Sequence, residues 1–254
     1  MAKPEKGVAW VTGAGTGIGR GLARRLAEDG WTVAASARTA RDLDSLAAEV
    51  PGRITAVQLD VTDAGACDAA GRRIEATLGP VDLAILNAGA SFPSSAASFS
   101  VANFRRTVDL NLMGEINCMG PIVPGMVARR SGHIVLMGSL SGYLGLPLAA
   151  PYSATKAALI SAAQAFRADF ERHGVAISIV NPGFVRTPMT DRNAIPMPFL
   201  IDIDEAVDRI MRGIARRQFE IAFPFRAVLA IRLAAALPNW ARLILSRRML
   251  PRDR

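Results

Sequence analysis

The feature that most limits the fold of this chain is a glycine-rich turn between an apolar segment and a helical pattern. Residues 7–12 are apolar and β-prone, the run GAGTGIG follows at 13–19, and a helical pattern comes next. Gly13, Gly17 and Gly19 allow a tight turn, close approach of the backbone to a pyrophosphate, and packing of the helix on the strand. The helix N-terminus adds unpaired N–H groups. The run predicts a nucleotide phosphate site, although such turns without a ligand also exist.

Strands and helices then alternate along the chain. Residues 32–37 predict a buried strand, 40–50 a helix and 54–59 a third strand. Residues 81–86 predict a fourth apolar strand, and 219–223 a last one. This alternation favours an α/β fold, a Rossmann-like doubly wound parallel sheet of about seven strands.

The end of the second predicted strand bears on the choice of nucleotide. In the NAD-binding form of this fold an acidic residue stands there and binds the ribose 2′-hydroxyl. This chain has Ala37 at that place, followed by Arg38, so no carboxylate repels a 2′-phosphate and a guanidinium can bind it. The pair predicts NADP(H) as the preferred cofactor and NAD(H) as the second option; Arg38 as an ordinary surface charge is the alternative. Asp60 would lie near the adenine or cap the helix that follows.

Tyr152 and Lys156 bring a phenol and an ammonium together. If residues 153–170 form a helix, the two side chains lie four positions apart on one face. A tyrosine keeps its proton at neutral pH, and a neighbouring cation favours the phenolate, so the pair could act as an acid or a base. Such spacing is common by chance. Ser139, thirteen positions before Tyr152, adds a hydroxyl to the pair.

Two asparagines stand where a side-chain amide would have a specific role. Asn87 opens the turn Asn87-Ala88-Gly89 at the carboxyl end of a predicted strand, where open parallel sheets bind ligands, although a purely structural turn is an alternative. Asn111 lies in a helix predicted over residues 101–127, and asparagine is unfavourable in mid-helix. We therefore expect a specific interaction at Asn111.

Charge and cysteine content limit which binding partners and which cellular compartment are expected. Thirty basic against 22 acidic residues give a net charge of +8, but the first two hundred residues contain no basic block typical of nucleic-acid binding. Cys67 and Cys118 match no metal or redox spacing, so no metal is predicted and a reducing compartment is favoured. The sequence shows neither a signal peptide nor an apolar run of membrane-spanning length, so the cytoplasm is expected.

Taken together, the motifs resemble the short-chain dehydrogenase/reductase family in its single-domain form. The resemblance covers roughly residues 7 to 222. It is carried by the cofactor motif at 12–19, the sheet-stabilising motif Asn87-Ala88-Gly89, the catalytic core Ser139, Tyr152 and Lys156, its fourth member Asn111, and the segment NPGFVRT at 181–187 beside the nicotinamide.

The resemblance implies an NAD(P)-dependent oxidoreductase that interconverts a carbonyl compound and its alcohol. Tyr152 would be the general acid or base, Ser139 would hydrogen-bond the substrate oxygen, and Lys156 would also bind the nicotinamide ribose. Asn111 would hold a water that connects Lys156 to solvent, and Ser141 is less suited than Ser139 by its spacing. The cofactor-binding residues expected from the turn, the strand ends and the motifs are Gly13, Thr16, Gly17, Ile18, Gly19, Arg38, Asp60, Val61, Asn87, Ala88, Gly89, Tyr152, Lys156, Pro182, Gly183, Val185 and Thr187.

The two stretches that wall the substrate pocket in this family are apolar here. We expect a hydrophobic ketone, aldehyde or secondary alcohol as substrate, although each residue alone could belong to the core. Asp191 and Arg192 would contact a polar tail or only water. The apolar wall residues are Leu144, Leu146, Pro147 and Leu148 in the first stretch, and Pro188, Met189, Ile195, Met197, Pro198, Phe199 and Leu200 in the second, which is often a mobile lid.

The C-terminal region departs from the commonest family pattern. We expect a single catalytic domain over 1–223 and a basic, apolar, helical extension over 224–254, with helices at 227–237 and 240–250. The ending through which many members form tetramers is missing, so we expect a homodimer through the helices beginning near Val101 and Ser153. Packing of the extension on the protein is favoured over peripheral contact with an anionic membrane. A non-catalytic NADP(H) sensor and a membrane-associated binding protein are the alternative functions.

Overall fold

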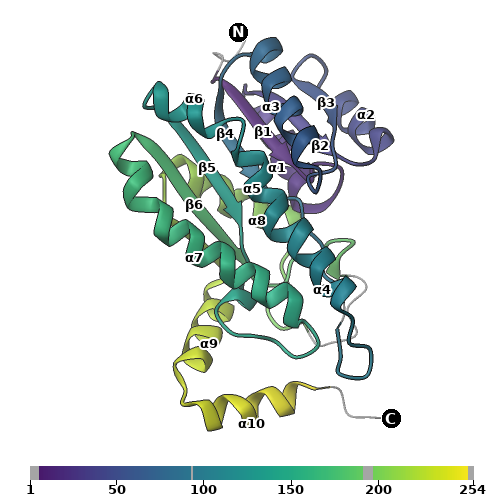
Figure 1. The fold of residues 1–254 in the computed structure, drawn as a ribbon, viewed down its shortest axis with the longest axis vertical. Helices are drawn as coiled ribbons and strands as arrows, with labels where there is room; N and C mark the ends of the chain where they lie inside the picture. The colour runs from purple at the N-terminus through teal and green to yellow at the C-terminus, as the bar shows by residue number, and fades with distance from the viewer. Residues whose placement is uncertain (1–5, 93, 191–196, 251–254) are drawn as a thin grey trace.

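A seven-stranded parallel sheet forms the centre of the molecule (Figure 1). The structure is a computed structural model, and it describes residues 6–92, 94–190 and 197–250. The strands are β1 (Val8–Thr12), β2 (Thr32–Ala37), β3 (Ile54–Gln58), β4 (Val81–Leu86), β5 (Gly132–Met137), β6 (Val175–Pro182) and β7 (Glu220–Phe223), in the spatial order β3-β2-β1-β4-β5-β6-β7. The expected doubly wound fold is confirmed.

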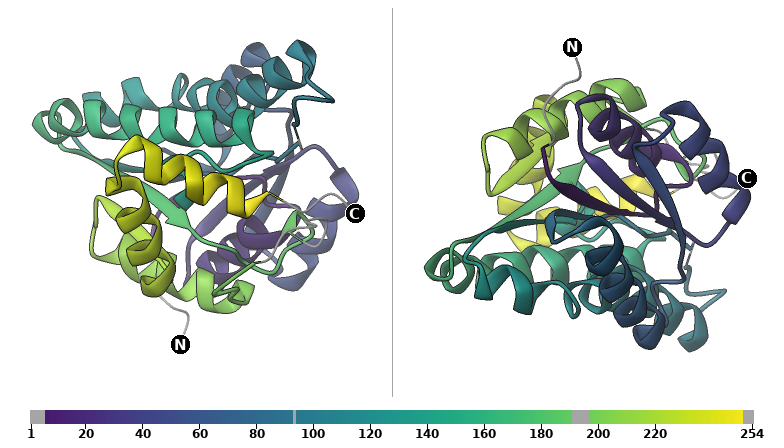
Figure 2. Two further views of the ribbon diagram at one scale, coloured as in Figure 1. Left: turned by 90° about the horizontal axis from the view of Figure 1, so that it is seen from below. Right: turned by 90° about the horizontal axis from the view of Figure 1, so that it is seen from above.

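Helices cover both faces of the sheet (Figure 2). The buried side chains of the sheet are divided between its two faces. In β1, for example, Val8 and Trp10 pack on one face, while Ala9 and Val11 pack on the other. One face is covered by α3 (Ala64–Leu78), α5 (Gly114–Met119), α6 (Val123–Ala128) and α7 (Ala150–Arg172). The other is covered by α1 (Gly17–Glu28), α2 (Ala40–Glu49) and α8 (Ile203–Ala215).

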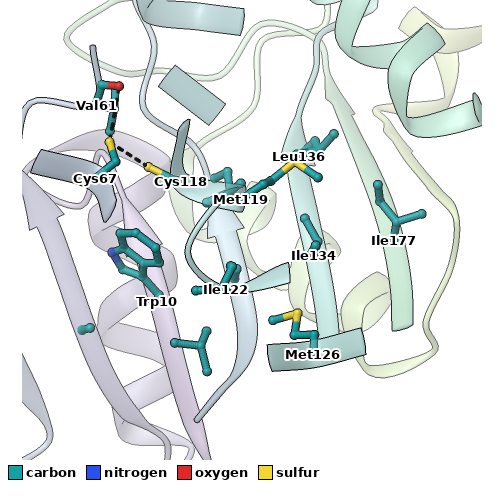
Figure 3. Packing of buried hydrophobic residues seen from close by; sticks show 14 of the residues in the cluster. Trp10, Val61, Cys67, Cys118, Met119, Ile122, Met126, Ile134, Leu136 and Ile177 are labelled. Atoms are coloured by element: carbon teal, nitrogen blue, oxygen red, sulfur yellow. Dashed lines mark hydrogen bonds between the residues drawn. The ribbon is translucent and has the colours of Figure 1, made fainter. Parts of the chain in front are cut away.

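The helices of the first face enclose an apolar core around Trp10 (Figure 3). Ile122, Met126 and Ile134 are fully buried there. Cys67 and Cys118 also belong to this core, with their sulfurs 3.7 Å apart as free thiols. The indole N–H of Trp10 donates to Ser36 Oγ at 2.9 Å, so this buried polar group is satisfied.

The helical stretch expected over residues 101–127 is present, but it is interrupted. The chain forms α4 (Val101–Val108), a π-helical turn η1 (Asp109–Met113) and α5, and then breaks before α6. The break falls at Gly120-Pro121, and proline cannot supply the N–H that a continuing helix needs. The π-helical turn contains Asn111, which already stood out as unfavourable in mid-helix.

Two further helices follow β7 and lie at the end of the molecule where α7 begins (Figure 1). α9 (Phe225–Ala236) packs against β7 and the short 3₁₀ turn η2 (Leu140–Gly142), and Arg232 of α9 pairs with Glu220 of β7. α10 (Asn239–Met249) has no buried side chain among the residues described here. Within those residues, too, every helix is too short or too polar to cross a bilayer.

The division between core and extension predicts a contrast between two leucines. Leu26 on α1 is fully buried, whereas Leu243 on α10 is 59% exposed. Leu26→Ala should lower the free energy of unfolding by about 2–5 kcal/mol through lost burial and a cavity. Leu243→Ala, the matched control, should change it by less than about 0.5 kcal/mol. Chemical denaturation measures both, and equal effects would contradict this assignment of the core.

Candidate active site

A cleft of about 320 Å³ opens at the carboxyl ends of the strands, where the order of the sheet reverses between β1 and β4. The structure places most of the predicted site residues in its wall. These are Gly13, Thr16, Gly17, Ile18, Arg38, Asp60, Val61, Asn87, Ala88, Gly89, Ser139, Tyr152, Lys156, Pro182, Gly183, Val185 and Thr187. Gly19 and Asn111 lie behind the wall and do not line the cleft.

The glycine turn has a backbone conformation and a packing that require glycine. Gly13 and Gly17 have φ angles of +65° and +58°, which favour glycine. A Cβ on Gly19 would lie 2.3 Å from the carbonyl oxygen of Gly13, so Gly19 serves the close packing of α1 on the turn. The N-terminus of α1 begins at this turn and offers N–H groups to an anion. These features fit a dinucleotide pyrophosphate.

Asn87 ties the end of β4 to the glycine turn. Its side-chain N–H donates to the carbonyl oxygens of Thr12 and Gly13, at 3.1 Å and 3.3 Å. In return, the Thr12 hydroxyl oxygen accepts the backbone N–H groups of Asn87 and Ala88, at 2.9 Å and 3.2 Å. The structural role of this turn is therefore present, and its residues also border the cleft.

At the other end of the cleft, Arg38 follows β2 and is exposed. Asp60 accepts the N–H and the hydroxyl of Thr62, at 3.0 Å and 2.8 Å. The Thr62 backbone N–H is the main cause that lowers the Asp60 pKa, with Arg38 adding to it and burial opposing. The suggestion that Asp60 caps the next helix is wrong, because Asp63 caps α3 by accepting the Ala66 N–H.

Tyr152, Lys156 and Ser139 converge on one side of the cleft. Tyr152 and Lys156 lie on α7, with Lys156 Nζ 5.8 Å from the centre of the Tyr152 ring. Ser139 follows β5, and its Oγ accepts the backbone N–H and the hydroxyl of Ser141, at 3.2 Å and 3.0 Å. Ser141 is buried and orients Ser139, which itself faces the cleft.

Asn111 connects the π-helical turn to the loop after β4 and to α7 through hydrogen bonds. Its Oδ1 accepts the Ala90 N–H and its Nδ2 donates to the Ala90 carbonyl oxygen, both at 2.8 Å. Nδ2 also lies 3.4 Å from the hydroxyl of Thr155, next to Lys156 on α7. These bonds explain why asparagine is tolerated in the middle of a helix.

Glu115 is a buried acid beside the lysine that the sequence analysis missed. Lys156 Nζ donates to the Met137 carbonyl oxygen at 2.5 Å and lies 3.5 Å from Glu115 Oε1. Glu115 Oε2 accepts the Met137 N–H at 3.2 Å. Burial raises the pKa of Glu115 to about 8, although Lys156 and the Met137 N–H lower it in part. A single acid in the run following Asn111 was the only sequence signal for this contact.

The chain matches the sequence model of the short chain dehydrogenase family over residues 7–196. The chain belongs to this family. It is 37% identical over 242 residues to an uncharacterized oxidoreductase of Myxococcus xanthus, covering 94% of this chain and 96% of the relative. It is 32% identical over 187 residues to the 3-oxoacyl-(acyl-carrier-protein) reductase FabG of Staphylococcus aureus, covering 72% and 76%.

A solved structure of a short-chain dehydrogenase from Streptomyces avermitilis superposes with a TM-score of 0.80 and 25% identity, covering 94% of this chain and 95% of that one. Family, relatives and fold agree. The protein is an NAD(P)-dependent oxidoreductase of the short-chain dehydrogenase family.

The substrate side of the cleft differs in part from the expected walls. Pro188 and Met189 line the cleft, with Leu110 from the π-helical turn as an apolar wall residue that was not predicted. Leu144, Leu146, Pro147 and Leu148 are half-buried and lie outside its lining. Asp191, Arg192 and Ile195 fall outside the described residues, while Phe199 is exposed.

The raised pKa of Glu115 predicts a pH-dependent difference in stability. A carboxyl whose pKa is raised from 4.5 to about 8 on folding stabilises the protein at low pH, and this contribution is lost as the pH rises through about 8. Glu115→Gln should therefore gain stability relative to the wild type between pH 4.5 and 8. Urea unfolding at several pH values measures the difference. A difference that is constant across this range would contradict the raised pKa.

Proposed function

We propose that this oxidoreductase interconverts a hydrophobic ketone or aldehyde and its alcohol, with NADP(H) as its preferred cofactor. The observation that carries the proposal is the meeting of Ser139, Tyr152 and Lys156 in one cleft that continues into the glycine turn. The nicotinamide would supply a hydride to the carbonyl carbon, or accept one from the alcohol. The substrate oxygen then needs a proton donor and a hydrogen-bond donor, and the described cleft provides both.

Tyr152 is the proton donor in this proposal. Its phenol would transfer a proton to the carbonyl oxygen during reduction and take it back during oxidation. The Ser139 hydroxyl would donate a hydrogen bond to the same oxygen, where negative charge develops. Lys156 supplies positive charge beside the Tyr152 ring and would bind the ribose hydroxyls. Asn111 supports the lysine from behind the wall, through the turn that packs on α7.

The preference for NADP(H) rests on the end of β2. Ala37 is the last residue of β2, so no carboxylate occupies the place that binds a 2′-hydroxyl in the NAD form. Arg38 is exposed at the rim of the cleft, where a 2′-phosphate would lie. Asp42, in the first turn of α2, also lines the cleft, and the sequence analysis had not considered this acidic side chain.

The apolar lining supports a hydrophobic substrate. Leu110, Val185, Pro188 and Met189 contribute apolar surface to the lining of the cleft. The relative from Staphylococcus aureus is named as a reductase of 3-oxoacyl groups. An acyl-like ketone is therefore a reasonable first compound to test on this chain.

Removal of the Tyr152 hydroxyl tests the proton transfer. Tyr152→Phe should lower kcat by at least about a hundredfold, since general acid catalysis contributes on that order, and should leave NADPH binding nearly unchanged. Tyr143→Phe is the matched control, because Tyr143 is the other tyrosine and bonds to Glu220 and Asn181 instead of lining the cleft. Turnover kinetics and NADPH fluorescence titration measure the two effects. Retained turnover in Tyr152→Phe would refute its role.

Exchange of the residues at the end of β2 tests the cofactor preference. The double variant Ala37→Asp, Arg38→Ala should lose at least about tenfold in affinity for NADPH relative to NADH, because a charge-assisted contact of a few kcal/mol becomes a repulsion. Arg41→Ala is the control, as it removes an exposed arginine three positions away. Isothermal titration with both cofactors gives the ratio. An unchanged ratio would assign the preference to other residues.

A further inference from the structure

The last residue of β5 has backbone groups that its neighbouring strand does not reach. β4 pairs with β5 as far as Leu86 and Leu136, whereas β6 pairs with β5 up to Met137. On the open side, the Met137 N–H donates to Glu115 and the Met137 carbonyl oxygen accepts from Lys156. Buried backbone groups require partners. The two side chains thus replace the missing strand, at a residue that lines the cleft.

Glu115 and Lys156 are also buried against each other. The exposed fraction is 0% for the Glu115 side chain and 3% for Lys156, and the two charged groups are 3.5 Å apart. Taking both charges out of water is costly, and burial accordingly raises the pKa of Glu115 to about 8. Burial thus favours the protonated, neutral carboxyl over the carboxylate. Lys156 then contributes a net positive charge to the cleft, which an ionised Glu115 would cancel.

The charge around Glu115 is determined mainly by Glu115 and Lys156. Among the described residues, the titratable groups that interact with Glu115 are Lys156 from α7 and Cys118 from its own helix. The hydrogen bond with Cys67, together with burial, raises the pKa of Cys118, so it remains a neutral thiol. β5 contributes the backbone of Met137.

We propose that Glu115 is a positioning residue for Lys156: its neutral carboxyl holds the end of β5 while leaving the lysine charge to the cleft, and its ionisation weakens the site at alkaline pH. This inference rests on the proposed function, since it gives Lys156 the task of binding the cofactor ribose and supporting Tyr152. Glu115 itself does not line the cleft and acts through Lys156 and Met137.

Glu115→Gln is the informative variant, because glutamine keeps an oxygen for the Met137 N–H and cannot ionise. The chain offers a matched control in Glu75. This carboxylate also accepts a strand N–H, from Val81 at 3.4 Å, and lies 3.9 Å from the cation of Arg129. It stands at the opposite end of the sheet, at the start of β4. Glu75→Gln therefore changes the same kind of contact away from the cleft.

The experiment compares kcat, KM for NADPH and the dissociation constant of NADPH from pH 6 to 9.5 in the wild type and both variants. We expect Glu115→Gln to lie within about twofold of the wild type at pH 6.5. Above about pH 8 the neutral fraction of Glu115 falls about tenfold per pH unit, so the NADPH affinity and kcat/KM of the wild type should decline. Glu115→Gln should lack this decline, and Glu75→Gln should follow the wild type.

Two results would overturn the inference. One is a pH profile of Glu115→Gln that coincides with that of the wild type above pH 8. The other is a folded Glu115→Gln protein that has lost turnover or NADPH binding at pH 6.5, which would mean that the carboxylate itself is required. Circular dichroism and thermal unfolding establish that the variant is folded.

The readouts separate this inference from the proposed function. If the wild type turns over no carbonyl compound, the proposed function fails, but the pH dependence of NADPH binding still decides the role of Glu115. Infrared difference spectra add a direct test, because a buried protonated carboxyl absorbs separately from carboxylates. That band should disappear between pH 7 and 9.5 in the wild type and be absent from Glu115→Gln. Its absence from the wild type at pH 7 would also overturn the inference.

Discussion

The site depends on how the parallel sheet satisfies its backbone groups where its strands end. At the carboxyl edge the strands separate, and their N–H and C=O groups lose the neighbours that pair them elsewhere. Side chains take over: Thr12 and Asn87 join β1 to β4, Asn111 holds the Ala90 peptide, and Glu115 and Lys156 hold Met137. Asn87 and Lys156 line the cleft themselves, whereas Thr12, Asn111 and Glu115 hold the backbone of residues that line it. The geometry of the site and the integrity of the sheet edge are therefore linked.

The same link explains why a buried acid can persist beside Lys156. A buried ion pair seldom stabilises a fold more than apolar residues of similar size would. Glu115 fills a place in which a strand residue leaves an N–H without a partner, so an oxygen is needed there irrespective of its charge. The charge state is then free to influence Lys156, which faces the cleft that Tyr152 and Ser139 share.

Much of the fold could be predicted from the sequence, because the spacing of apolar residues and the residue types in turns depend on neighbouring residues alone. The strand, glycine turn and helix around Gly13 lie where the pattern placed them, and the extension forms two helices within two residues of the expected bounds. The break between α5 and α6 was missed although Pro121 signalled it, since the apolar spacing on both sides reads as continuous. Asp60 was suggested as the cap in place of Asp63 because either residue can cap a helix, and only the path of the backbone decides which one does.

Glu115 could not be assigned from the sequence. Its partners are 22 and 41 residues away, and they meet it only through the packing of α5, β5 and α7.

The central claim is that this cleft transfers hydride to a hydrophobic carbonyl under the control of Tyr152. The most direct measurement uses NADPH that carries deuterium at the transferable position of nicotinamide C4, with NADH labelled in the same way in parallel, across apolar ketones and aldehydes of increasing chain length. The account predicts an alcohol product with one deuterium on its carbinol carbon, formed faster with NADPH and with longer apolar chains. Tight binding of NADPH without transfer of deuterium to any member of the series would contradict it.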